Sequence, residues 1–292
     1  HESPFERVAG ILKDRNIQGG RIGLEETVRY FVVDGMKKAA PSIEIVSATP
    51  VTQGCRMYKS AAEIALMKKA NEITLTAYEH VYRNLEAEME PGDVKALMAS
   101  AQSQLGGVGI WNMALFGVAS AYPHGTSLPQ KIEEGQIVLM DCGCSVEGYQ
   151  SDISRTFVYG EPTARQREVW NTVRKGQQIA FETAQLGVKA GQVDDAVRSY
   201  YESLGWGPGY GVPGLSHRTG HGIGMDGHER VNFVHGEETP LAPGMCFSNE
   251  PGLYDFDTYG VRLEDCIHMT AEGPAWFTVP PDSLESPVGR MG

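Results

Sequence analysis

An internal duplication restricts the fold of this chain more than any other feature of its sequence. One helical segment spans residues 92–106 and another spans residues 191–205, with an offset of 99 residues at both ends. Each follows a longer helical segment that opens with a capping box, Ser60–Glu63 before the first and Thr163–Gln166 before the second. Two amphipathic helices can resemble each other by coincidence, but the match of both pairs favours a duplicated unit of two helices followed by strands.

The strands that follow each helix pair carry the same kind of side chain. Two apolar strands of the first half bear Asp141 and Asp152, and two apolar strands of the second half bear Glu250 and Glu264. The sequence therefore predicts an α/β fold whose halves pack about a pseudo-two-fold axis, with the four carboxylates together at the centre. The predicted halves span about residues 60–160 and 163–275.

Asp141 and Asp152 lie on either side of an expected tight turn in the stretch DCGCSVEGYQSD. With Val146–Glu147 as the two-residue loop of a β-hairpin, the two aspartates face each other directly across the strands. Like charges opposed across strands repel, so this register predicts a cation, a proton or water between them. The thiols of Cys142 and Cys144 alternate with Asp141 along the strand and are expected to point away from the site.

Four converging carboxylates need compensation, because buried charges must pair, bind metal or take up protons. Two divalent cations balance four carboxylates formally, and carboxylate oxygens suit hard ions such as Mg²⁺ and Mn²⁺. One imidazole ligand shifts the preference towards Mn²⁺, Co²⁺, Fe²⁺ or Zn²⁺, and the stretch SHRTGHGIGMDGHER offers His217, His221 and His228. Such a pair of ions can hold a bridging hydroxide and polarise a carbonyl group, which predicts hydrolytic chemistry.

Two motif matches in the same stretch are excluded by their context. Residues 222–227 fit the dinucleotide-binding fingerprint G-x-G-x-x-G, but no amphipathic helix follows them. His217 and His221 have the spacing of a helical zinc pair, but the glycines around them argue against a helix.

Each candidate residue taken alone also fits an ordinary structural role. Asp141 could end a strand, Glu264 could pair with Arg262, and His124 could lie in a turn. The combination of two aspartates, three histidines in a Gly-rich stretch and two strand glutamates is far rarer by chance. It is the combination that indicates a metal centre.

The composition excludes several classes of protein. The net charge of −12 and the lack of a long basic run argue against a nucleic-acid partner. No apolar run of about eighteen residues occurs, so neither a transmembrane helix nor a membrane partner is expected. Five cysteines without zinc-finger or CxxC spacing predict reduced thiols and a cytoplasmic protein.

Five motifs occur together in this chain: PHG, DCGCSVEGYQSDISRTF, HRTGHGIGMDGHE, NEPGLY and GVRLED. Together they resemble the pita-bread metallopeptidases, the family of prolidase, Xaa-Pro aminopeptidase and methionine aminopeptidase. The resemblance covers about residues 53–280 and implies the pita-bread fold with two divalent metal ions, of which Mn²⁺ is the expected one. It implies the metal ligands Asp141, Asp152, His221, Glu250 and Glu264.

The resemblance also implies roles around the metals. Glu250 is expected to take the proton of the attacking water, and His228 to contact the substrate and the tetrahedral intermediate. His124 matches a second substrate-side histidine. His217 and Arg262 match residues that line the substrate site in the proline-specific branch of the family.

The first part of the chain favours that proline-specific branch. Residues 1–52 alternate helix, strand, helix and strand without a complete core, with the last strand expected at residues 43–51. They resemble the C-terminal part of a truncated N-terminal domain of the creatinase and prolidase type. That domain helps relatives to dimerise, so a homodimer is expected of the full-length protein. Residues 53–292 are expected to form the catalytic domain.

The expected reaction is metal-dependent hydrolysis of the peptide bond before proline in Xaa-Pro dipeptides or short peptides, as in prolidase. The alternative is an Xaa-Pro aminopeptidase acting on longer peptides, although the short separation of Glu250 and Glu264 resembles prolidase more closely. A non-peptidase hydrolase and a non-enzymatic binding protein on the same fold are further alternatives. The full set of matched ligands argues against both.

Overall fold

The computed structural model describes residues 2–292, which divide into two compact units between Arg56 and Met57. This division lies four residues beyond the boundary expected after residue 52. The assignment of the first unit to the end of a larger domain stays a prediction. Among the described residues, no helix has both the length and the apolar composition needed to cross a bilayer.

The first unit alternates helices with two short parallel strands. Its elements are α1 (Pro4–Asp14), β1 (Gly20–Leu24), α2 (Tyr30–Ala39), β2 (Ile43–Ser47) and α3 (Thr49–Met57), which runs one residue past the division. The strand expected over residues 43–51 is wrong beyond Ser47. The Ser47 hydroxyl accepts a hydrogen bond from the backbone N–H of Thr49 at 3.2 Å, and Pro50 lies in the first helical turn, where it has no N–H to satisfy.

The long helices of the second unit form two matched pairs. They are α4 (Ala61–Arg83) with α5 (Pro91–Gln104), and α6 (Ala164–Thr183) with α7 (Ala190–Ser203). Both ends of α7 lie 99 residues after the corresponding ends of α5, as the sequence predicts. The capping boxes Ser60–Glu63 and Thr163–Gln166 are both present at the starts of the longer helices. The duplicated order of elements is therefore confirmed, while the two-fold axis stays a prediction.

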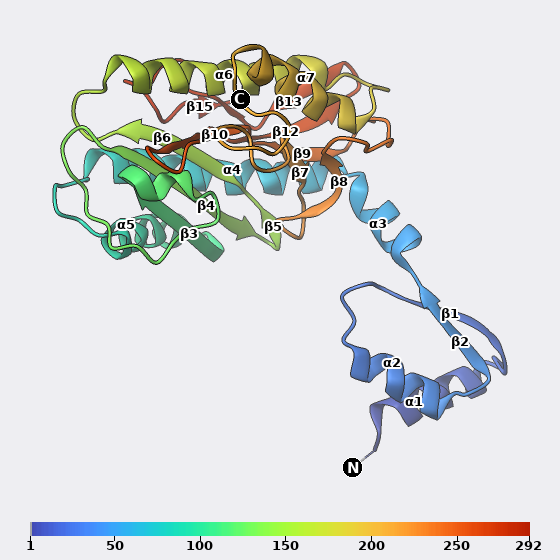
Figure 1. Cartoon of the computed structure of the whole chain (residues 1–292). Coiled ribbons are helices and arrows are strands. Elements are labelled where there is room, and N and C mark those ends of the chain that lie inside the picture. The colour runs from blue at the N-terminus through green and yellow to red at the C-terminus, as the bar shows by residue number, and fades with distance from the viewer. Residues whose placement is uncertain (1) are drawn as a thin grey trace. The chain divides into compact units, whose positions relative to one another are not determined.

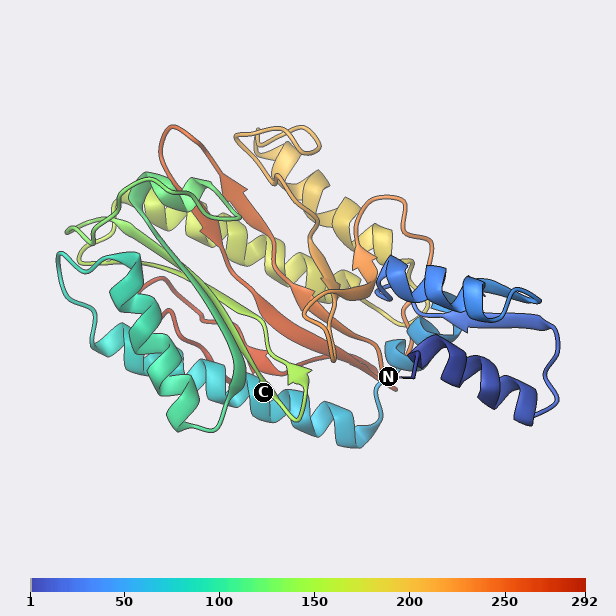
Figure 2. The ribbon, with the colours of Figure 1, turned by 90° about the horizontal axis from the view of Figure 1, so that it is seen from below.

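The strands of the second unit lie between these helix pairs (Figures 1 and 2). In the first sheet β4 pairs with β3, β5 and β6; its strands are β3 (Val108–Phe116), β4 (Ile137–Val146), β5 (Tyr149–Gln150) and β6 (Ile153–Val158). The second sheet has the order β13-β12-β9-β7-β8; its strands are β7 (Gly220–Gly222), β8 (Glu229–Phe233), β9 (Cys246–Asn249), β12 (Asp265–Thr270) and β13 (Gly273–Trp276). The remaining elements are η1 (Gly117–Ala121), β10 (Gly252–Tyr254) paired with β11 (Gly260–Arg262), and β14 (Thr278–Val279) paired with β15 (Arg290–Met291).

Strand β6 is held from both helix pairs. Tyr78 of α4 donates a hydrogen bond to the Ile153 carbonyl at 2.7 Å, and Trp170 of α6 donates one to the Thr156 carbonyl at 2.9 Å. Both aromatic side chains are buried in the same hydrophobic core. Because a buried ring with a satisfied polar atom packs in one orientation, these contacts fix the strand that follows Asp152.

A buried ion pair joins the two sheets. Arg155 of β6 and Asp265 of β12 approach to 2.6 Å, with side chains 1% and 0% exposed. The Asp265 carboxylate also accepts hydrogen bonds from Gln177 and Thr278. Each member of the pair immediately follows a residue of the site in sequence, Ser154 and Glu264, so the pair aligns one half of the molecule with the other.

Candidate metal centre

All the predicted site residues line one cavity of about 700 Å³ in the second unit. They are His124, Asp141, Asp152, His217, His221, His228, Glu250, Arg262 and Glu264. The structure confirms that neither excluded motif is present. His221 lies in strand β7 rather than in a helix, and residues 222–227 are followed by strand β8 rather than by a helix.

The hairpin that carries the two aspartates turns one residue later than expected. Its loop is Glu147–Gly148, with φ of 49° and 84°, the positive angles of a type I′ turn. Asp141 therefore pairs with Ser154 rather than with Asp152, and the predicted register is wrong by two residues. Gly148 explains the difference, since glycine adopts positive φ at least cost and must lie in the turn. A shift of two keeps Asp141 and Asp152 on one face, where they lie diagonally rather than opposite each other.

The two glutamates of the second half do lie opposite each other. Strands β9 and β12 pair Asn249 with Asp265, and strands β10 and β11 pair Gly252 with Arg262. These two ladders keep one antiparallel register, so Glu250 faces Glu264 in the short interval between them. A break between the strands frees this interval from regular pairing and lets both carboxylates turn into the cavity.

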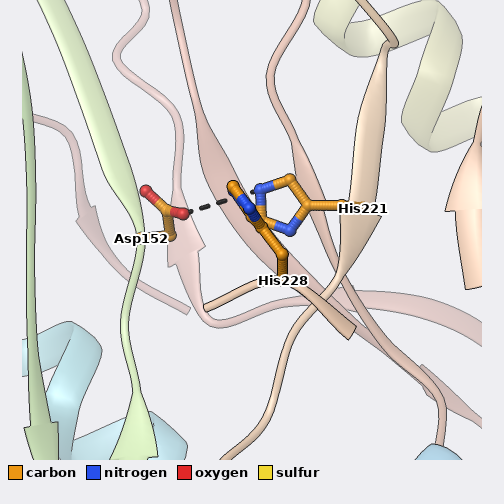
Figure 3. A group of neighbouring side chains, drawn as sticks. All are labelled: Asp152, His221 and His228. Carbon is orange, nitrogen blue, oxygen red and sulfur yellow. Dashed lines mark ion pairs between the residues drawn. The ribbon is translucent and has the colours of Figure 1, made fainter. Parts of the chain in front are cut away.

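Three overlapping groups of side chains have ligand atoms that lie within 4.8 Å of one another. The groups are Asp141, Asp152 and Glu264; His221, Glu250 and Glu264; and Asp152, His221 and His228. The first two contain the five ligands that the sequence predicts. The third adds His228, whose ring lies 4.2 Å from that of His221 (Figure 3). His228, which was predicted to contact the substrate, thus also lies near enough to the predicted metal ligands to be a ligand itself.

Bare carboxylate oxygens show that the donor set fits a cation. Asp141 Oδ1, Asp152 Oδ1 and Glu264 Oε1 are buried and have no hydrogen-bond partner among the described residues. Burial, together with the neighbouring carboxylates, raises the pKa of Asp152 and of Glu264 well above its usual range. Burial also raises the pKa of Glu250 to about 7. Buried carboxylates in this state favour divalent cations, which compensate their charge and bind their free oxygens.

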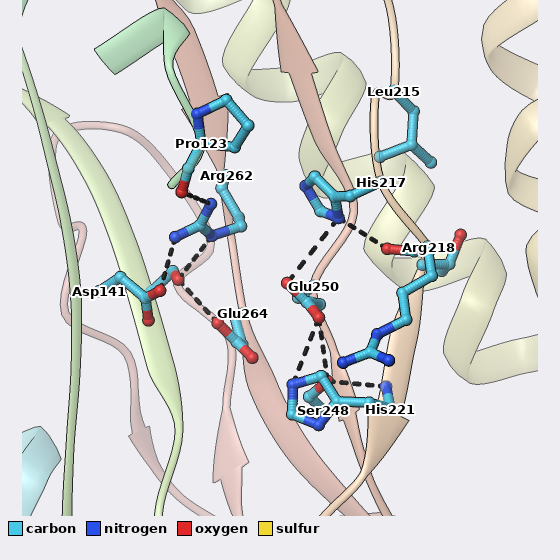
Figure 4. A network of polar contacts seen from close by, with 12 residues as sticks. Pro123, Asp141, Leu215, His217, Arg218, His221, Ser248, Glu250, Arg262 and Glu264 are labelled. Carbon is cyan, nitrogen blue, oxygen red and sulfur yellow. Dashed lines mark hydrogen bonds and ion pairs between the residues drawn. The ribbon is translucent and has the colours of Figure 1, made fainter. Parts of the chain in front are cut away.

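His221 is held in the form that binds metal. Its Nδ1 lies 3.0 Å from the Gly222 carbonyl, which can only accept, so the ring proton is on Nδ1. Its Nε2 lies 3.6 Å from Asp152 Oδ2 and 3.4 Å from Glu250 Oε1. Burial lowers the pKa of His221 well below its usual value, which keeps the imidazole neutral. The free Nε2 lone pair therefore faces the carboxylates (Figure 4).

Each nitrogen of Arg262 already donates to a neighbour (Figure 4). Nε donates to the Ser154 hydroxyl at 2.9 Å, Nη1 to the Tyr254 hydroxyl at 3.1 Å and to the Pro123 carbonyl at 3.2 Å, and Nη2 to Asp141 at 2.6 Å. The side chain is only 3% exposed. Arg262 lines the cavity as predicted, but its charge is directed at Asp141.

Ser154 completes a second link between the halves. Its hydroxyl donates to Glu264 Oε2 at 2.7 Å while it accepts from Arg262. A donor of the first half thus orients a carboxylate of the second, and Arg262 of the second half orients Asp141 of the first.

The other histidines occupy different parts of the cavity. His217 Nε2 lies 2.8 Å from the Tyr254 hydroxyl, and its Nδ1 lies 3.9 Å from Glu250 Oε2. Burial lowers the pKa of His217 to about 3, so its imidazole is neutral. His124 and His228 are exposed and line the cavity.

Several residues of this site were missed by the sequence analysis. Ser154 and Tyr254 each lie an even number of residues from a predicted ligand, so strand alternation could have placed them on the same face. Asp194 and Arg198 of α7 carry no such signal. Arg198 donates to Asp194 at 2.7 Å and to the His217 carbonyl at 2.6 Å, and thereby fixes the backbone of His217.

Comparisons with known proteins agree with this geometry. The sequence profile of metallopeptidase family M24 matches residues 65–271. The Xaa-Pro dipeptidase of Pyrococcus horikoshii is 31% identical over 261 residues, which cover 88% of this chain and 72% of that protein. The solved structure of Xaa-Pro dipeptidase from Bacillus anthracis has a TM-score of 0.88 and 30% identity, with 96% of this chain and 78% of that one covered. The solved X-Pro aminopeptidase from Thermotoga maritima MSB8 has a TM-score of 0.86 and 27% identity, with 97% and 79% covered. These likenesses confirm the expected α/β fold of the pita-bread type.

Proposed function

The chain belongs to metallopeptidase family M24, and from this premise we propose that it hydrolyses the peptide bond before proline in Xaa-Pro dipeptides or short peptides. The observation that carries the proposal is the convergence of four carboxylates and a neutral imidazole, three carboxylate oxygens being bare, on a cavity of about 700 Å³. Relatives named Xaa-Pro dipeptidase support the choice of bond.

The ligands of two divalent cations would be Asp141, Asp152, His221, Glu250 and Glu264, the set that the family resemblance implies. When bound, such cations lower the pKa of water towards neutrality and polarise a carbonyl group. The chain's own contribution is to hold its ligand atoms in place. Arg262 serves this purpose by donating to Asp141, and so we propose it as a positioning residue rather than a direct contact of the substrate.

Glu250 is our candidate for the residue that accepts the proton of the attacking water. Its two oxygens face different sides of the site, with Oε1 3.4 Å from His221 and Oε2 3.9 Å from His217. A carboxylate in this position can serve the metal side and the substrate side at once.

His228 would donate a hydrogen bond to the carbonyl oxygen of the scissile bond as negative charge develops on it. His124 and His217 would contact the rest of the substrate. The positions of His124 and His228 at the cavity edge, and of His217 beside Tyr254, support these roles.

Three further properties belong to this proposal. Mn²⁺ is the metal we propose, because carboxylates outnumber imidazoles in the ligand set. A cytoplasmic location is supported by the five cysteines, which are all free thiols. A homodimer is supported by Tyr30 and Phe31, large apolar side chains that are 77% and 61% exposed.

The test measures the cleavage of three peptides, Ala-Pro, Ala-Ala and Ala-Pro-Ala. Each is incubated with protein that has been stripped of metal by a chelator, and with the same protein loaded with Mn²⁺, Co²⁺, Zn²⁺ or Fe²⁺. We expect the Mn²⁺-loaded protein to cleave Ala-Pro, and not Ala-Ala, while the stripped protein cleaves neither. Loaded protein that cleaves none of the peptides would refute the proposal.

An Xaa-Pro aminopeptidase is the second candidate, favoured by the structural likeness to the enzyme of Thermotoga maritima. The third peptide, Ala-Pro-Ala, decides between the two. Rapid cleavage of Ala-Pro-Ala with little cleavage of Ala-Pro would establish the aminopeptidase.

A further inference from the structure

A buried ion pair lies beside the segment that carries His228. Lys59 Nζ and Glu229 Oε2 are 2.8 Å apart, and their side chains are 3% and 6% exposed. Neither residue is among those that line the cavity. Removing two charges from water costs about as much free energy as their attraction returns, so a buried pair is weak evidence for stability. The pair therefore calls for a conformational explanation.

The segment in question is the histidine loop, residues 223–228, which joins β7 to β8 without helix or strand structure. Glu229 Oε1 accepts hydrogen bonds from the backbone N–H of Met225 at 2.9 Å and of Asp226 at 3.2 Å. One oxygen of the Glu229 carboxylate thus binds the histidine loop, and the other binds Lys59. Glu229 also follows His228 directly, so its contacts restrain the backbone that carries that imidazole.

The first half of the unit holds the opposite side of the histidine loop. The backbone N–H of Gln150 donates to the Gly224 carbonyl at 2.8 Å, and its side-chain amide donates to the Met225 carbonyl at 3.1 Å. A Cβ added at Gly224 would lie 2.6 Å from Lys59 Cε and 2.8 Å from Glu229 Oε2. Glycine at this position lets the ion pair lie against the loop, and a larger residue would displace the ends of both side chains.

Lys59 itself starts from a fixed point. Its backbone N–H donates to the Gly244 carbonyl at 2.8 Å, and the next residue is the N-cap of α4. The ammonium group therefore reaches Glu229 from an anchored backbone and is not free to follow the histidine loop if the loop moves.

We propose that the Lys59–Glu229 ion pair is a positioning device that holds the histidine loop so that His228 meets the carbonyl oxygen of the substrate. The inference rests on the proposed function, because it takes His228 to act on the substrate. Lys59 acts through Glu229, and Glu229 acts through the loop.

The main experiment is a double-mutant cycle with Lys59→Met and His228→Ala, assayed on Ala-Pro with Mn²⁺ loaded. Outer partners of metal ligands typically contribute about 10- to 100-fold to metal affinity or activity, and we take the same range for residues that orient His228. We expect Lys59→Met to lower kcat by about this factor with bound metal and KM unchanged, and to cause no further loss in the His228→Ala background. Lys59→Arg should restore most of the rate. Lys69→Met is the matched control, since it removes the lysine of an exposed ion pair with Glu72 on α4.

Equal losses from Lys59→Met in both backgrounds would overturn the inference, and so would an unchanged kcat. If Lys59→Met does not fold, the double variant Lys59→Met/Glu229→Gln, which removes both charges of the ion pair, is put through the same cycle. Amide hydrogen exchange gives a readout that needs no substrate. The Met225 and Asp226 amides should exchange faster in the variant, and unchanged exchange would reject the inference even if wild type cleaved no Xaa-Pro peptide. If wild type cleaves no Xaa-Pro peptide but the amides exchange faster in the variant, the lack of cleavage counts against the proposed function and not against the role of the ion pair in holding the loop.

Discussion

The two halves of the second unit contribute to the candidate metal centre in different ways. The first half places Asp141 and Asp152 diagonally on one hairpin with a regular type I′ turn. The second half places Glu250 directly opposite Glu264, in a break between two ladders. The shorter helices α5 and α7 have 14 residues each, whereas α4 has 23 residues and α6 has 20. The helix pairs therefore repeat the same scaffold in the same order, and the two halves differ in the register of the strands that carry the carboxylates.

The halves also depend on each other for orientation. Asp141 of the first half receives its hydrogen bond from Arg262, and Glu264 of the second half receives its hydrogen bond from Ser154. Neither half contains the donor for its own carboxylate in this pair of contacts. The carboxylates are thus oriented correctly only when the two halves are packed together, and single substitutions can test each contact separately.

The largest effect is expected from Asp152→Asn, which removes the charge of a proposed ligand in the first half. The amide leaves the cluster with one negative charge fewer and replaces an acceptor oxygen by a donor. We expect bound metal, measured by elemental analysis, to fall and turnover to be abolished. A variant that keeps full metal and normal turnover would remove Asp152 from the ligand set.

The next largest effects are expected from substitutions of two histidines in the second half, His221 and His228. His228→Ala should keep its fold but lose about 10²–10³ in turnover, or roughly 2.7–4 kcal/mol, the usual cost of one donor to an oxyanion. His221→Ala should lose metal as well. Metal content and kcat of both variants test this assignment directly. Because His228 lies within the ligand cluster, metal depletion in His228→Ala would make it a ligand and transfer the substrate role elsewhere.

A smaller loss is expected from Ser154→Ala, which cuts the link from the first half to Glu264. Outer hydrogen bonds to metal ligands usually contribute about 10- to 100-fold to metal affinity. We expect a weakening in this range by titration of metal-free protein with Mn²⁺. Ser203→Ala, at an exposed helix end, is the control. Unchanged affinity would show that Glu264 is held without the first half.

The smallest expected effect is a difference in pH dependence between the capping boxes Ser60–Glu63 and Thr163–Gln166. Hydrogen bonds from Ser60 and Tyr149 lower the pKa of Glu63 below its ordinary 4.5, whereas Gln166 of the second box does not titrate. The cap of α4 is therefore fully effective above pH 4.5 and weakens as pH falls through the lowered pKa of Glu63. Amide exchange should show the Ser60 protection factor decreasing in acid while that of Thr163 holds. Parallel decreases would mean that acid acts elsewhere.

Local signals account for the parts of the fold that the sequence predicts. Capping boxes and helix spacing involve residues three or four apart, and strand alternation has a period of two, so both are readable along the chain. The hairpin error was avoidable, because Gly148 marks the turn. The extension of a strand over Thr49 and Pro50 was also a local error, since the Ser47 hydroxyl accepts from the Thr49 N–H and a helix begins at Thr49.

Residues that position the site could not be predicted in this way. Lys59 meets Glu229 across 170 positions of sequence, and nothing in either neighbourhood identifies the partner. Arg198 donates to backbone carbonyls of Gly209, Leu215 and His217, which every residue type possesses. Because a backbone carbonyl is the same in every residue, a hydrogen bond to one leaves no recognisable pattern in the sequence. Only the packed chain reveals which lysine or arginine has such a role.

The hydrogen bond between Ser154 and Glu264 joins residues 110 positions apart, and this separation sets an order of events during synthesis. At translation rates of about 5–20 residues per second, the ribosome needs roughly 5–20 seconds to go from one residue to the other. During that interval the emerging chain holds both aspartates and gains His221 and then Glu250, but it lacks Glu264 until the interval ends. The nascent first half must therefore stay free of stable misfolding until the second half arrives, and loading of the proposed metals would be one of the last steps in maturation.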